Sequence, residues 1–463
     1  MTHSLPVTEY SRRRQQLLAQ LPCASAVLLP AAKLRYRNRD AEHAFRQSSD
    51  FLYLSGLSEP DALLLLLKSA EGAVESILFV LPRDPAQETW TGYRVGPEGA
   101  VQTFGFDRGF NLDQQSVQLP LLLSGYERIY YPFSAPVDNP DGLAAQIQRC
   151  CQQLQLKGRS AQSAPQQLHN IEPLLHEMRL IKSEAEQQQM RRAARVSARA
   201  HRLAMQNCRP GMFEYQLEAD IQHSFAQQGC RFSAYGTIVG SGANACILHY
   251  TQNQDAMQAG DLVLIDAGCE QEGYAGDITR TFPVNGRFSA EQKALYQSVL
   301  DAQDAAIAAI KPGACFDDPH QAALRVLVEG LVANGLLKGD VEALIASEAY
   351  KPFYMHRTSH WLGLDVHDVG DYQQDGRSRL LLPGMVLTIE PGLYIAPDNL
   401  QVEARWRGIG IRIEDDLLVT ALGCEVLSKD APKQIEEIEA LMAQDRTGLL
   451  DAKIALADKA TNE

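Results

Sequence analysis

The sequence predicts a mixed α/β protein of two domains. Its 463 residues are enough for two to three domains. Up to about residue 170, short apolar runs typical of strands alternate with polar stretches that permit helices, whereas the later part carries long capped helices followed by strand-rich blocks. A composition of 45% hydrophobic and 22% charged residues indicates a soluble globular chain with a large core.

The first part of the chain is expected to form a small α/β domain. The runs SAVLLP, ALLLLL, SILFVLP and RIYYPF predict strands, and residues 142–156 predict one of the helices between them. A Ser-, Gln- and Pro-rich stretch at residues 160–167 indicates a boundary loop. We therefore predict an N-terminal domain over residues 1–174, a second domain over 175–440 and a C-terminal tail over 441–463.

The second domain is expected to open with two helices. Ser183 and Glu186 form a capping-box pattern that begins a long helix, which continues to about Met205. The Arg-Pro-Gly sequence at 209–211 ends it, and a second amphipathic helix is predicted over 214–228.

The same order of signals returns later in the chain. Ser289 and Gln292 form a second capping box, and Lys-Pro-Gly at 311–313 ends the helix that follows. The glycines of the two Pro-Gly breaks lie 102 positions apart, from 211 to 313. We infer an internal duplication, with coincidence as the alternative because Pro-Gly is common after helices.

Four strand-rich blocks are expected to form a curved, mostly antiparallel sheet backed by these helices. Such a sheet would gather the polar faces of its strands into one cleft. The blocks are residues 231–249, 261–282, 384–394 and 408–420.

The net charge and the cysteines limit which partners and which cellular compartment we expect for the protein. A formal net charge of −14 and a pI near 5.3 argue against nucleic acid or an anionic membrane as the main partner. Nine cysteines without a CxxC pair indicate reduced thiols. The first residues lack the apolar core of a signal peptide, and the leucine run at 63–67 is far shorter than the roughly 20 residues of a membrane helix. We expect a cytoplasmic protein in which this run is a buried strand.

Four carboxylates and one imidazole stand in short apolar, Gly-rich segments of the second domain. They are Asp266 in VLIDAG, Asp277 in YAGDIT, His360 in SHWLGLDVHDVG, Glu390 in LTIEPG and Glu414 in GIGIRIED. Carboxylates gathered at one point would repel each other by about 4 kcal/mol per pair at 4 Å and an effective dielectric near 20. Two divalent cations would balance four such charges, and oxygen ligands with one imidazole suit manganese, with cobalt or zinc as alternatives. A pair of ions supports metal-assisted hydrolysis, so we predict a hydrolase with a dinuclear centre.

Strand alternation places the last of these carboxylates beside an arginine. In GIGIRIED the isoleucines Ile409, Ile411 and Ile413 share one face, which leaves Arg412 and Glu414 together on the other. The arginine can therefore neutralise or orient a ligand carboxylate.

These motifs resemble a known family. The segments VLIDAGCEQEGYAGDITRTFP, HWLGLDVHDVG, LTIEPGLYIAP and GIGIRIEDD resemble the metal-dependent pita-bread peptidases, most closely their aminopeptidase P branch, the bacterial Xaa-Pro aminopeptidases. The segment YRNRDAEHAFRQSSDFLYLSG extends the likeness into the N-terminal domain, so it covers residues 5 to 430 approximately. The resemblance implies a pita-bread catalytic domain with pseudo-twofold duplication.

The resemblance also implies a function. Members are typically manganese enzymes that release the N-terminal residue of peptides whose second residue is proline, by means of a hydroxide that bridges two metal ions. Asp277 and Glu414 would bridge the ions, Asp266 would be a further ligand, and His360 and Glu390 would complete the set of ligands around the second metal ion. Glu390 would also carry the proton from the attacking water to the leaving proline nitrogen.

Other residues acquire roles by the same likeness. His249 and His367 would donate to the oxyanion that forms at the scissile carbonyl, and His356 would contact the proline side of the substrate. The residues that would hold ligands and substrate in place are Tyr235, Tyr394 and Arg412.

Two residues of the N-terminal domain match positions that approach the active site in this family. They are Asp40 and Trp90, and the tryptophan would come from a neighbouring subunit, which implies a homo-oligomer, either a tetramer or a dimer. The chain departs from the family at Arg357 and Thr358, where members often have Gly-Leu, and this leaves the preferred substrate length open.

Three alternatives share parts of this pattern. Prolidase has the same ligands but cleaves only Xaa-Pro dipeptides. Methionine aminopeptidase usually lacks so large an N-terminal domain. A non-catalytic binding member of the fold would typically have lost one or more of the five ligands, all of which are present here.

Overall fold

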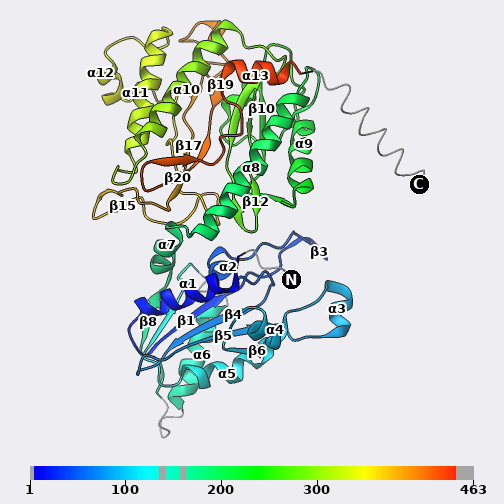
Figure 1. Ribbon diagram of the computed structural model, residues 1–463, viewed down its shortest axis with the longest axis vertical. Helices are drawn as coiled ribbons and strands as arrows, with labels where there is room; N and C mark the ends of the chain where they lie inside the picture. The colour runs from blue at the N-terminus through cyan, green and yellow to red at the C-terminus, as the bar shows by residue number, and fades with distance from the viewer. Residues whose placement is uncertain (1–4, 135–141, 157–162, 445–463) are drawn as a thin grey trace, which may run out of the picture. The chain divides into compact units, whose positions relative to one another are not determined.

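The chain forms two compact units that divide between Arg179 and Leu180 (Figure 1). The computed structural model describes residues 5–134, 142–156 and 163–444. Part of the expected boundary loop, 157–162, and most of the expected tail, 445–463, lie outside the described residues. The rest of the expected boundary loop runs into strand β8 (Gln167–Asn170), which pairs with β7 of the first sheet, so the first unit continues beyond this stretch.

The first unit contains a six-stranded mixed sheet with helices on both faces. The six strands of this sheet are β1 (Ser25–Pro30), β4 (Leu63–Lys68), β5 (Val74–Val80), β6 (Arg108–Asn111), β7 (Arg128–Tyr131) and β8. The strands β2 (Tyr36–Asn38) and β3 (Ala41–Glu42) pair with each other in a separate hairpin. The helices of this unit are α1 (Val7–Gln20), α2 (Ser49–Ser55), α3 (Pro85–Thr91), α4 (Gly96–Gln102), α5 (Gln115–Leu123), α6 (Leu143–Leu156) and α7 (Glu172–Leu180).

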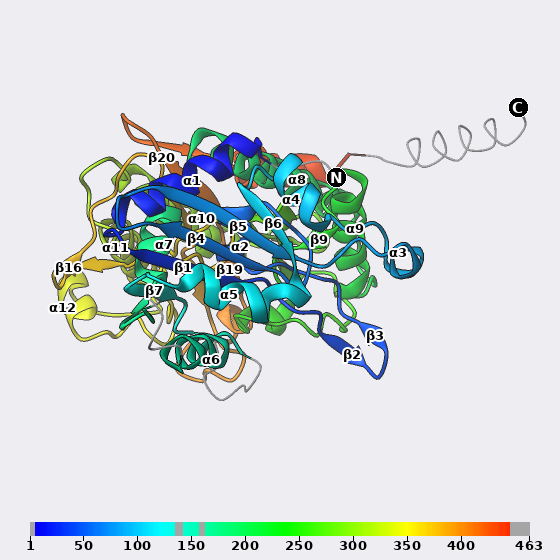
Figure 2. The ribbon, with the colours of Figure 1, turned by 90° about the horizontal axis from the view of Figure 1, so that it is seen from below.

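The sheet order is β6-β5-β4-β1-β7-β8, and Figure 2 shows β6, β5, β4 and β1 side by side in that order. Strands β5, β4 and β1 are antiparallel, whereas β6, β7 and β8 pair in parallel with their neighbours. Helices α5 and α6 bury their apolar residues against one face of this sheet. The four strand runs expected from the sequence are β1, β4, β5 and β7, and the leucine run of β4 is buried as expected.

The second unit carries two pairs of helices and several short antiparallel sheets. Its helices are α8 (Glu184–Asn207), α9 (Glu214–Gln227), α10 (Ala290–Ala309), α11 (Asp318–Ala333), α12 (Val341–Ala346) and α13 (Ile435–Met442). Its strands are β9 (Phe232–Ser233), β10 (Ile238–Ser241), β11 (Leu262–Asp266), β12 (Cys269–Gln271), β13 (Tyr274–Ala275), β14 (Thr279–Pro283), β15 (Gln373–Gln374), β16 (Arg377–Ser378), β17 (Val386–Ile389), β18 (Gly392–Tyr394), β19 (Gly410–Arg412), β20 (Asp415–Val419) and β21 (Cys424–Val426).

Both expected capping boxes open their helices. The Ser183 hydroxyl accepts from the Glu186 amide at 3.4 Å, while the Glu186 carboxylate accepts from the Ser183 amide at 2.9 Å. Ser289 and Gln292 make the same two bonds at the start of α10. Reciprocal bonds of this kind satisfy amides that have no partner within the helix, which fixes where each helix begins.

The second unit repeats one arrangement of elements. Figure 1 shows α8 beside α9, and α10 beside α11. The first pair leads to the antiparallel sheet β10-β11-β14 and the second to β17-β20-β21. Gly211 and Gly313, in the turns that follow α8 and α10, have φ of +86° and +84°, a backbone conformation that glycine adopts without strain. This is the helix, break, helix and strand repeat expected from the sequence.

The isoleucine face of the last motif faces the core, as expected. Ile409, Ile411 and Ile413 belong to the main apolar cluster of the second unit. A Cβ at Gly410 would lie 2.2 Å from the carbonyl oxygen of Ala245, so only glycine fits this close backbone approach.

The described helices include none with both the length and the hydrophobicity that crossing a membrane requires. All nine cysteines are free thiols.

Candidate metal centre

Two of the five expected ligands come from one β-hairpin. Asp266 is the last residue of β11 and pairs with Thr279 of β14, and Asp277 lies just before β14. Gly268 keeps the two arms close, because a Cβ there would lie 1.6 Å from the carbonyl oxygen of Gly276. The register therefore brings both carboxylates to the same end of the hairpin.

His360 and Glu390 lie on adjacent stretches of backbone. The segment that contains His360 runs beside β17, with the Thr388 amide donating to the His360 carbonyl at 3.0 Å. Farther along, the Glu390 amide donates to the Thr358 carbonyl at 2.9 Å. These two backbone hydrogen bonds hold the imidazole of His360 next to the carboxylate of Glu390, although neither residue belongs to a regular strand.

Glu414 reaches the hairpin through Thr279. Its amide donates to the Thr279 carbonyl at 3.0 Å, and the Thr279 hydroxyl donates to a Glu414 carboxylate oxygen at 2.7 Å. Arg412 donates to Asp266 at 2.6 Å, to the Thr279 hydroxyl at 3.1 Å and to the Tyr394 hydroxyl at 3.1 Å. The arginine expected to orient a ligand carboxylate therefore contacts Asp266, at the end of β11.

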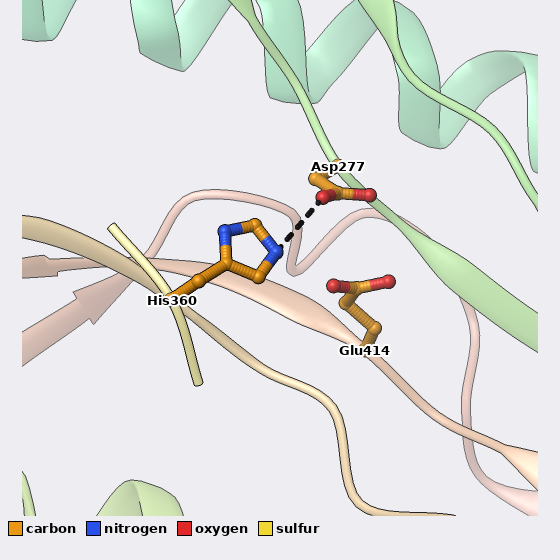
Figure 3. Close-up of side chains that lie close together, drawn as sticks. All are labelled: Asp277, His360 and Glu414. Carbon is orange, nitrogen blue, oxygen red and sulfur yellow. Dashed lines mark ion pairs between the residues drawn. The ribbon is translucent and has the colours of Figure 1, made fainter. Parts of the chain in front are cut away.

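Three of the expected ligands form a compact cluster (Figure 3). Ligand atoms of Asp277, His360 and Glu414 all lie within 4.8 Å of one another. The His360 Nε2 atom is 3.4 Å from Asp277 Oδ2 and 3.6 Å from Glu390 Oε1. Because the Nδ1–H of His360 donates to the Trp361 carbonyl at 2.9 Å, the other ring nitrogen, Nε2, faces the carboxylates.

Asp266 and Glu390 face the same space as this cluster. The Tyr235 hydroxyl lies 2.5 Å from Asp266 Oδ1 and 2.6 Å from Asp277 Oδ1, so one phenol joins the two aspartates. All five expected ligands line a cavity of about 990 Å³ in the second unit.

The other expected site residues divide into three groups. Those that also line this cavity are Tyr235, His249, His356, His367 and Arg412. Tyr394 is buried behind the cavity wall and is bonded to Arg412 and His356. Asp40 and Trp90 belong to the first unit, where both are exposed, Trp90 to 85%.

Burial and mutual repulsion make this cluster hard to ionise without cations. Burial raises the pKa of Glu390 to about 7 and the pKa of Glu414 well above the usual value, with neighbouring carboxylates adding to the second shift. Burial also raises the pKa of Asp277. Although burial alone would lower the pKa of His360, the facing carboxylates Asp277 and Glu390 outweigh it and raise that pKa to about 9. A cluster of this kind needs either protons or metal ions to balance its charge.

His356 is held in one neutral form. The Tyr394 hydroxyl receives a hydrogen bond from Arg412 and donates its own proton to His356 Nε2 at 2.8 Å. The Nδ1–H of His356 donates to the Arg357 carbonyl at 2.8 Å. Burial, with Arg412 nearby, lowers the pKa of His356 to about 4. Both nitrogens are engaged, so only the carbon edge and face of the ring are available to a ligand.

His249 and His367 differ from His356 because both are exposed to the cavity. The rings of His360 and His367 meet edge to face with centroids 4.5 Å apart. Burial and the neighbouring His360 lower the pKa of His367. Neither His249 nor His367 has a hydrogen-bond partner within the described part of the chain, so both can donate to a bound molecule.

Comparisons with known proteins show which family the chain belongs to. Residues 188–421 match the model of metallopeptidase family M24, and residues 10–130 match that of the aminopeptidase P N-terminal domain. The Xaa-Pro aminopeptidase of Escherichia coli (strain K12) is 48% identical over 443 residues, which cover 95% of this chain and 98% of that one.

The chain belongs to the aminopeptidase P branch of metallopeptidase family M24.

Solved structures of this family have the same fold over nearly their whole length. The aminopeptidase PepP of Pseudomonas aeruginosa superposes with a TM-score of 0.92 at 51% identity, covering 95% of this chain and 98% of that one. The Escherichia coli aminopeptidase P with the inhibitor Pro-Leu gives a TM-score of 0.91 at 48% identity, with the same coverage. As a member of this family, the chain is a metal-dependent hydrolase.

Three polar residues at the site of this family member did not stand out in the sequence. Thr279 links Glu414 to Arg412, and its position two residues after Asp277 in YAGDIT could have revealed that it shares a face with that carboxylate. Asp416 accepts from the Asp277 amide at 3.1 Å, and burial raises its pKa well above the usual value. Lys182 pairs with Asp368 at 2.9 Å, with both side chains buried, next to His367. No local sequence pattern predicts the ion pair of Lys182, because its partner Asp368 is 186 positions away in the chain.

Proposed function

We propose that this chain hydrolyses the bond between the N-terminal residue of a peptide and a proline at the second position, with two divalent metal ions. The observation that carries the proposal is the convergence of four buried carboxylates and one imidazole in a single cavity. The relatives named Xaa-Pro aminopeptidase, matched over almost their whole length, support the choice of substrate.

The donor set fits divalent cations. The ligands would be Asp266, Asp277, His360, Glu390 and Glu414, with Asp277 and Glu414 shared between two ions. Burial raises the pKa values of Glu390 and Glu414, and neighbouring carboxylates add to the shift of Glu414, so bound cations would stabilise the ionised forms. Oxygen ligands with one imidazole favour manganese, with cobalt or zinc as substitutes. When bound, such ions activate water at neutral pH and polarise the carbonyl under attack.

Glu390 is the proposed proton carrier. Burial raises its pKa to about 7 when no metal ion is bound, close to neutral pH, and this supports the role. The leaving proline nitrogen has no N–H in the peptide, so it must gain a proton as the bond breaks. A carboxyl held by its backbone bond to Thr358 can accept a proton on one side of the reaction and deliver it on the other.

Three histidines are proposed to act on the substrate. His249 and His367 would donate to the oxygen that becomes negative at the scissile carbonyl, because both face the cavity with nitrogens free of described partners. His356 would contact the proline ring through its carbon edge and face, since Tyr394 and the Arg357 carbonyl hold its nitrogens. Tyr235 and Arg412 would fix the aspartates.

The assembly and the compartment belong to the same proposal. We propose a homo-oligomer, a tetramer or a dimer, in which Asp40 and Trp90 approach an active site. The exposed indole of Trp90 suits an interface, because a large aromatic side chain is rarely left in water. Nine free thiols suit the reducing conditions of a cytoplasm.

A comparison of three peptides tests the proposal. The chelated protein, reconstituted with manganese, would be given an Xaa-Pro-Yaa tripeptide, an Xaa-Pro dipeptide and a Met-Ala-Yaa peptide. We expect release of Xaa from the tripeptide in preference to the other two. Cleavage of the dipeptide alone would indicate a prolidase, and no cleavage of any peptide, with or without manganese, would contradict the proposal.

A further inference from the structure

An exposed arginine lies at the cavity wall, away from the carboxylate cluster. Arg357 lines the cavity, with its side chain 60% exposed, and it forms an ion pair with Asp317, which is 40% exposed and also lines the cavity. Asp317 lies just before α11, whereas Arg357 follows His356 in the loop that leads to His360. The pair therefore joins a helix start to the loop that carries two site histidines.

This ion pair has little to contribute to folding. Ion pairs exposed to this extent are screened by water, and holding both side chains costs conformational entropy. Contact with Asp317 does, however, restrict where the guanidinium points. A guanidinium offers five N–H donors, so one carboxylate leaves donors available for a second anion.

The charges along the cavity make Arg357 distinctive. The described lining contains five carboxylates, those of Asp266, Asp277, Asp317, Glu390 and Glu414, and two arginines. Arg412 is buried and already donates to Asp266, Thr279 and Tyr394. Among the described residues that line the cavity, Arg357 is therefore the exposed arginine. The carboxylates of the lining would repel an anion that enters the cavity, unless bound metal ions balance their charge.

The proposed substrates carry such an anion. A peptide whose N-terminal part is bound at the cluster extends its C-terminal carboxylate away from it, by at most about 3.3 to 3.6 Å per residue. Arginine matches a carboxylate with two parallel N–H donors, and this geometry makes it a selective partner for the end of a peptide.

We propose that Arg357 binds the free C-terminal carboxylate of short peptide substrates, so that this enzyme favours free acids over amides at one particular peptide length. Asp317 is a positioning residue that holds the guanidinium at the cavity wall. The inference rests on the proposed function and adds a specificity determinant to it.

The test compares matched peptide acids and amides. A series from Xaa-Pro to Xaa-Pro-Yaa-Zaa-Zaa, each as free acid and as C-terminal amide, would be assayed with the manganese-loaded enzyme and with Arg357→Ala and Arg357→Lys. The readout is the ratio of KM for the amide to KM for the acid at each length. We expect this ratio to peak at one length in the wild type, at about 3- to 10-fold, which is the range for a partly exposed arginine–carboxylate contact.

The variants separate the possible results. Arg357→Ala should bring the peak ratio to about one, and Arg357→Lys should keep part of it, because charge remains while the planar fork is lost. The matched control is Arg325→Ala, since Arg325 also forms an exposed ion pair, with Glu342, but does not line the cavity. The control should keep the wild-type ratio.

Two outcomes would overturn the inference. One is a wild-type ratio near one at every length, and the other is an Arg357→Ala ratio equal to that of the wild type. In both cases cleavage before proline would continue, so the proposed function would stand. Absence of cleavage by the wild type would instead remove the proposed function itself.

Discussion

The backbone amide of Glu390 donates a hydrogen bond to the carbonyl oxygen of Thr358 at 2.9 Å. The side chain of Thr358 is itself fixed in the interior, with its hydroxyl 2.6 Å from the Tyr354 hydroxyl and 2.8 Å from His320 Nδ1. A buried polar chain therefore sets the backbone from which the proposed proton carrier extends. Such a chain is rigid because each of its groups would lose a partner if it moved.

Replacing Glu390 tests its double role. Glu390→Ala removes a proposed metal ligand and the proton carrier together, so we expect kcat to fall by about 10²- to 10⁴-fold while the fold is kept. Steady-state kinetics with an Xaa-Pro-Yaa peptide and circular dichroism would measure both quantities. Retention of more than about a tenth of the wild-type rate would contradict the role.

The oxyanion role of His249 predicts a loss of rate without a loss of stability. His249→Ala should lower kcat by about 10²- to 10³-fold, because one donor to the developing negative charge is removed. The side chain is exposed to the cavity, so the midpoint of thermal unfolding should change little. An unchanged kcat would make His249 a residue of the cavity wall only.

The buried pair of Lys182 and Asp368 predicts a large effect on stability. Both side chains are about 1% exposed and lie 2.9 Å apart. Lys182→Met would remove the ammonium group from a buried ion pair, and we expect a loss of about 3 to 5 kcal/mol in the free energy of unfolding. Urea unfolding at neutral pH would measure it.

An exposed pair serves as the control for that variant. Lys351 and Glu348 are 56% and 57% exposed, so Lys351→Met should change the unfolding midpoint little. Equal effects of the two lysine substitutions would show that burial does not set the strength of the pair. A double variant, Lys182→Met with Asp368→Asn, should lose less than the sum of the single changes.

His201 predicts a defined pH dependence of stability. It is fully buried, it donates from Nε2 to the Ala267 carbonyl at 3.0 Å, and burial lowers its pKa from 6.5 to about 4. The unfolded chain therefore binds a proton between pH 6.5 and 4 that the folded chain excludes, so stability falls as the pH decreases through this window and is unaffected above it. The slope for one group is at most about 1.4 kcal/mol per pH unit.

The measurement compares His201→Gln with the wild type, both saturated with manganese. Glutamine can keep a donor toward Ala267 but does not titrate, so the loss of stability from pH 7.5 to 5 should be smaller in the variant by about 2 kcal/mol. His320 and His356, which also have pKa values of about 4, keep contributing in both proteins. The exposed His43, changed to glutamine, provides the control. Parallel stability curves for wild type and His201→Gln would contradict the assignment.

The sequence predicted the elements best where the signals are local. Ser183 with Glu186 located the start of α8, and the alternation of Ile409, Ile411 and Ile413 located the buried face at β19, because capping and strand period depend on neighbours in the chain. The apolar, Gly-rich segments around four carboxylates and one histidine supplied the five-residue ligand set, and the resemblance to a family added the role of each residue. Their meeting in one cavity needed the structure, since it depends on strand register and on the backbone bonds of His360 and Glu390.

Contacts between distant segments were beyond the sequence. The pairing of Lys182 with Asp368, and that of Arg357 with Asp317, join residues far apart in the chain, and neither lies in a repeating pattern. The sequence also did not predict that both ring nitrogens of His356 form hydrogen bonds, because these bonds depend on the position of Tyr394 and on the orientation of the Arg357 carbonyl.

The central claim is that the carboxylate and histidine cluster holds two divalent ions on which hydrolysis depends. The most direct measurement titrates manganese into the chelated protein and follows bound metal and hydrolysis of an Xaa-Pro-Yaa peptide together, with Asp277→Asn as a comparison. We expect no activity without metal, two bound ions per chain at full activity, and a loss of bound metal in the variant. Full activity in the chelated protein, or unchanged metal binding by Asp277→Asn, would contradict the claim.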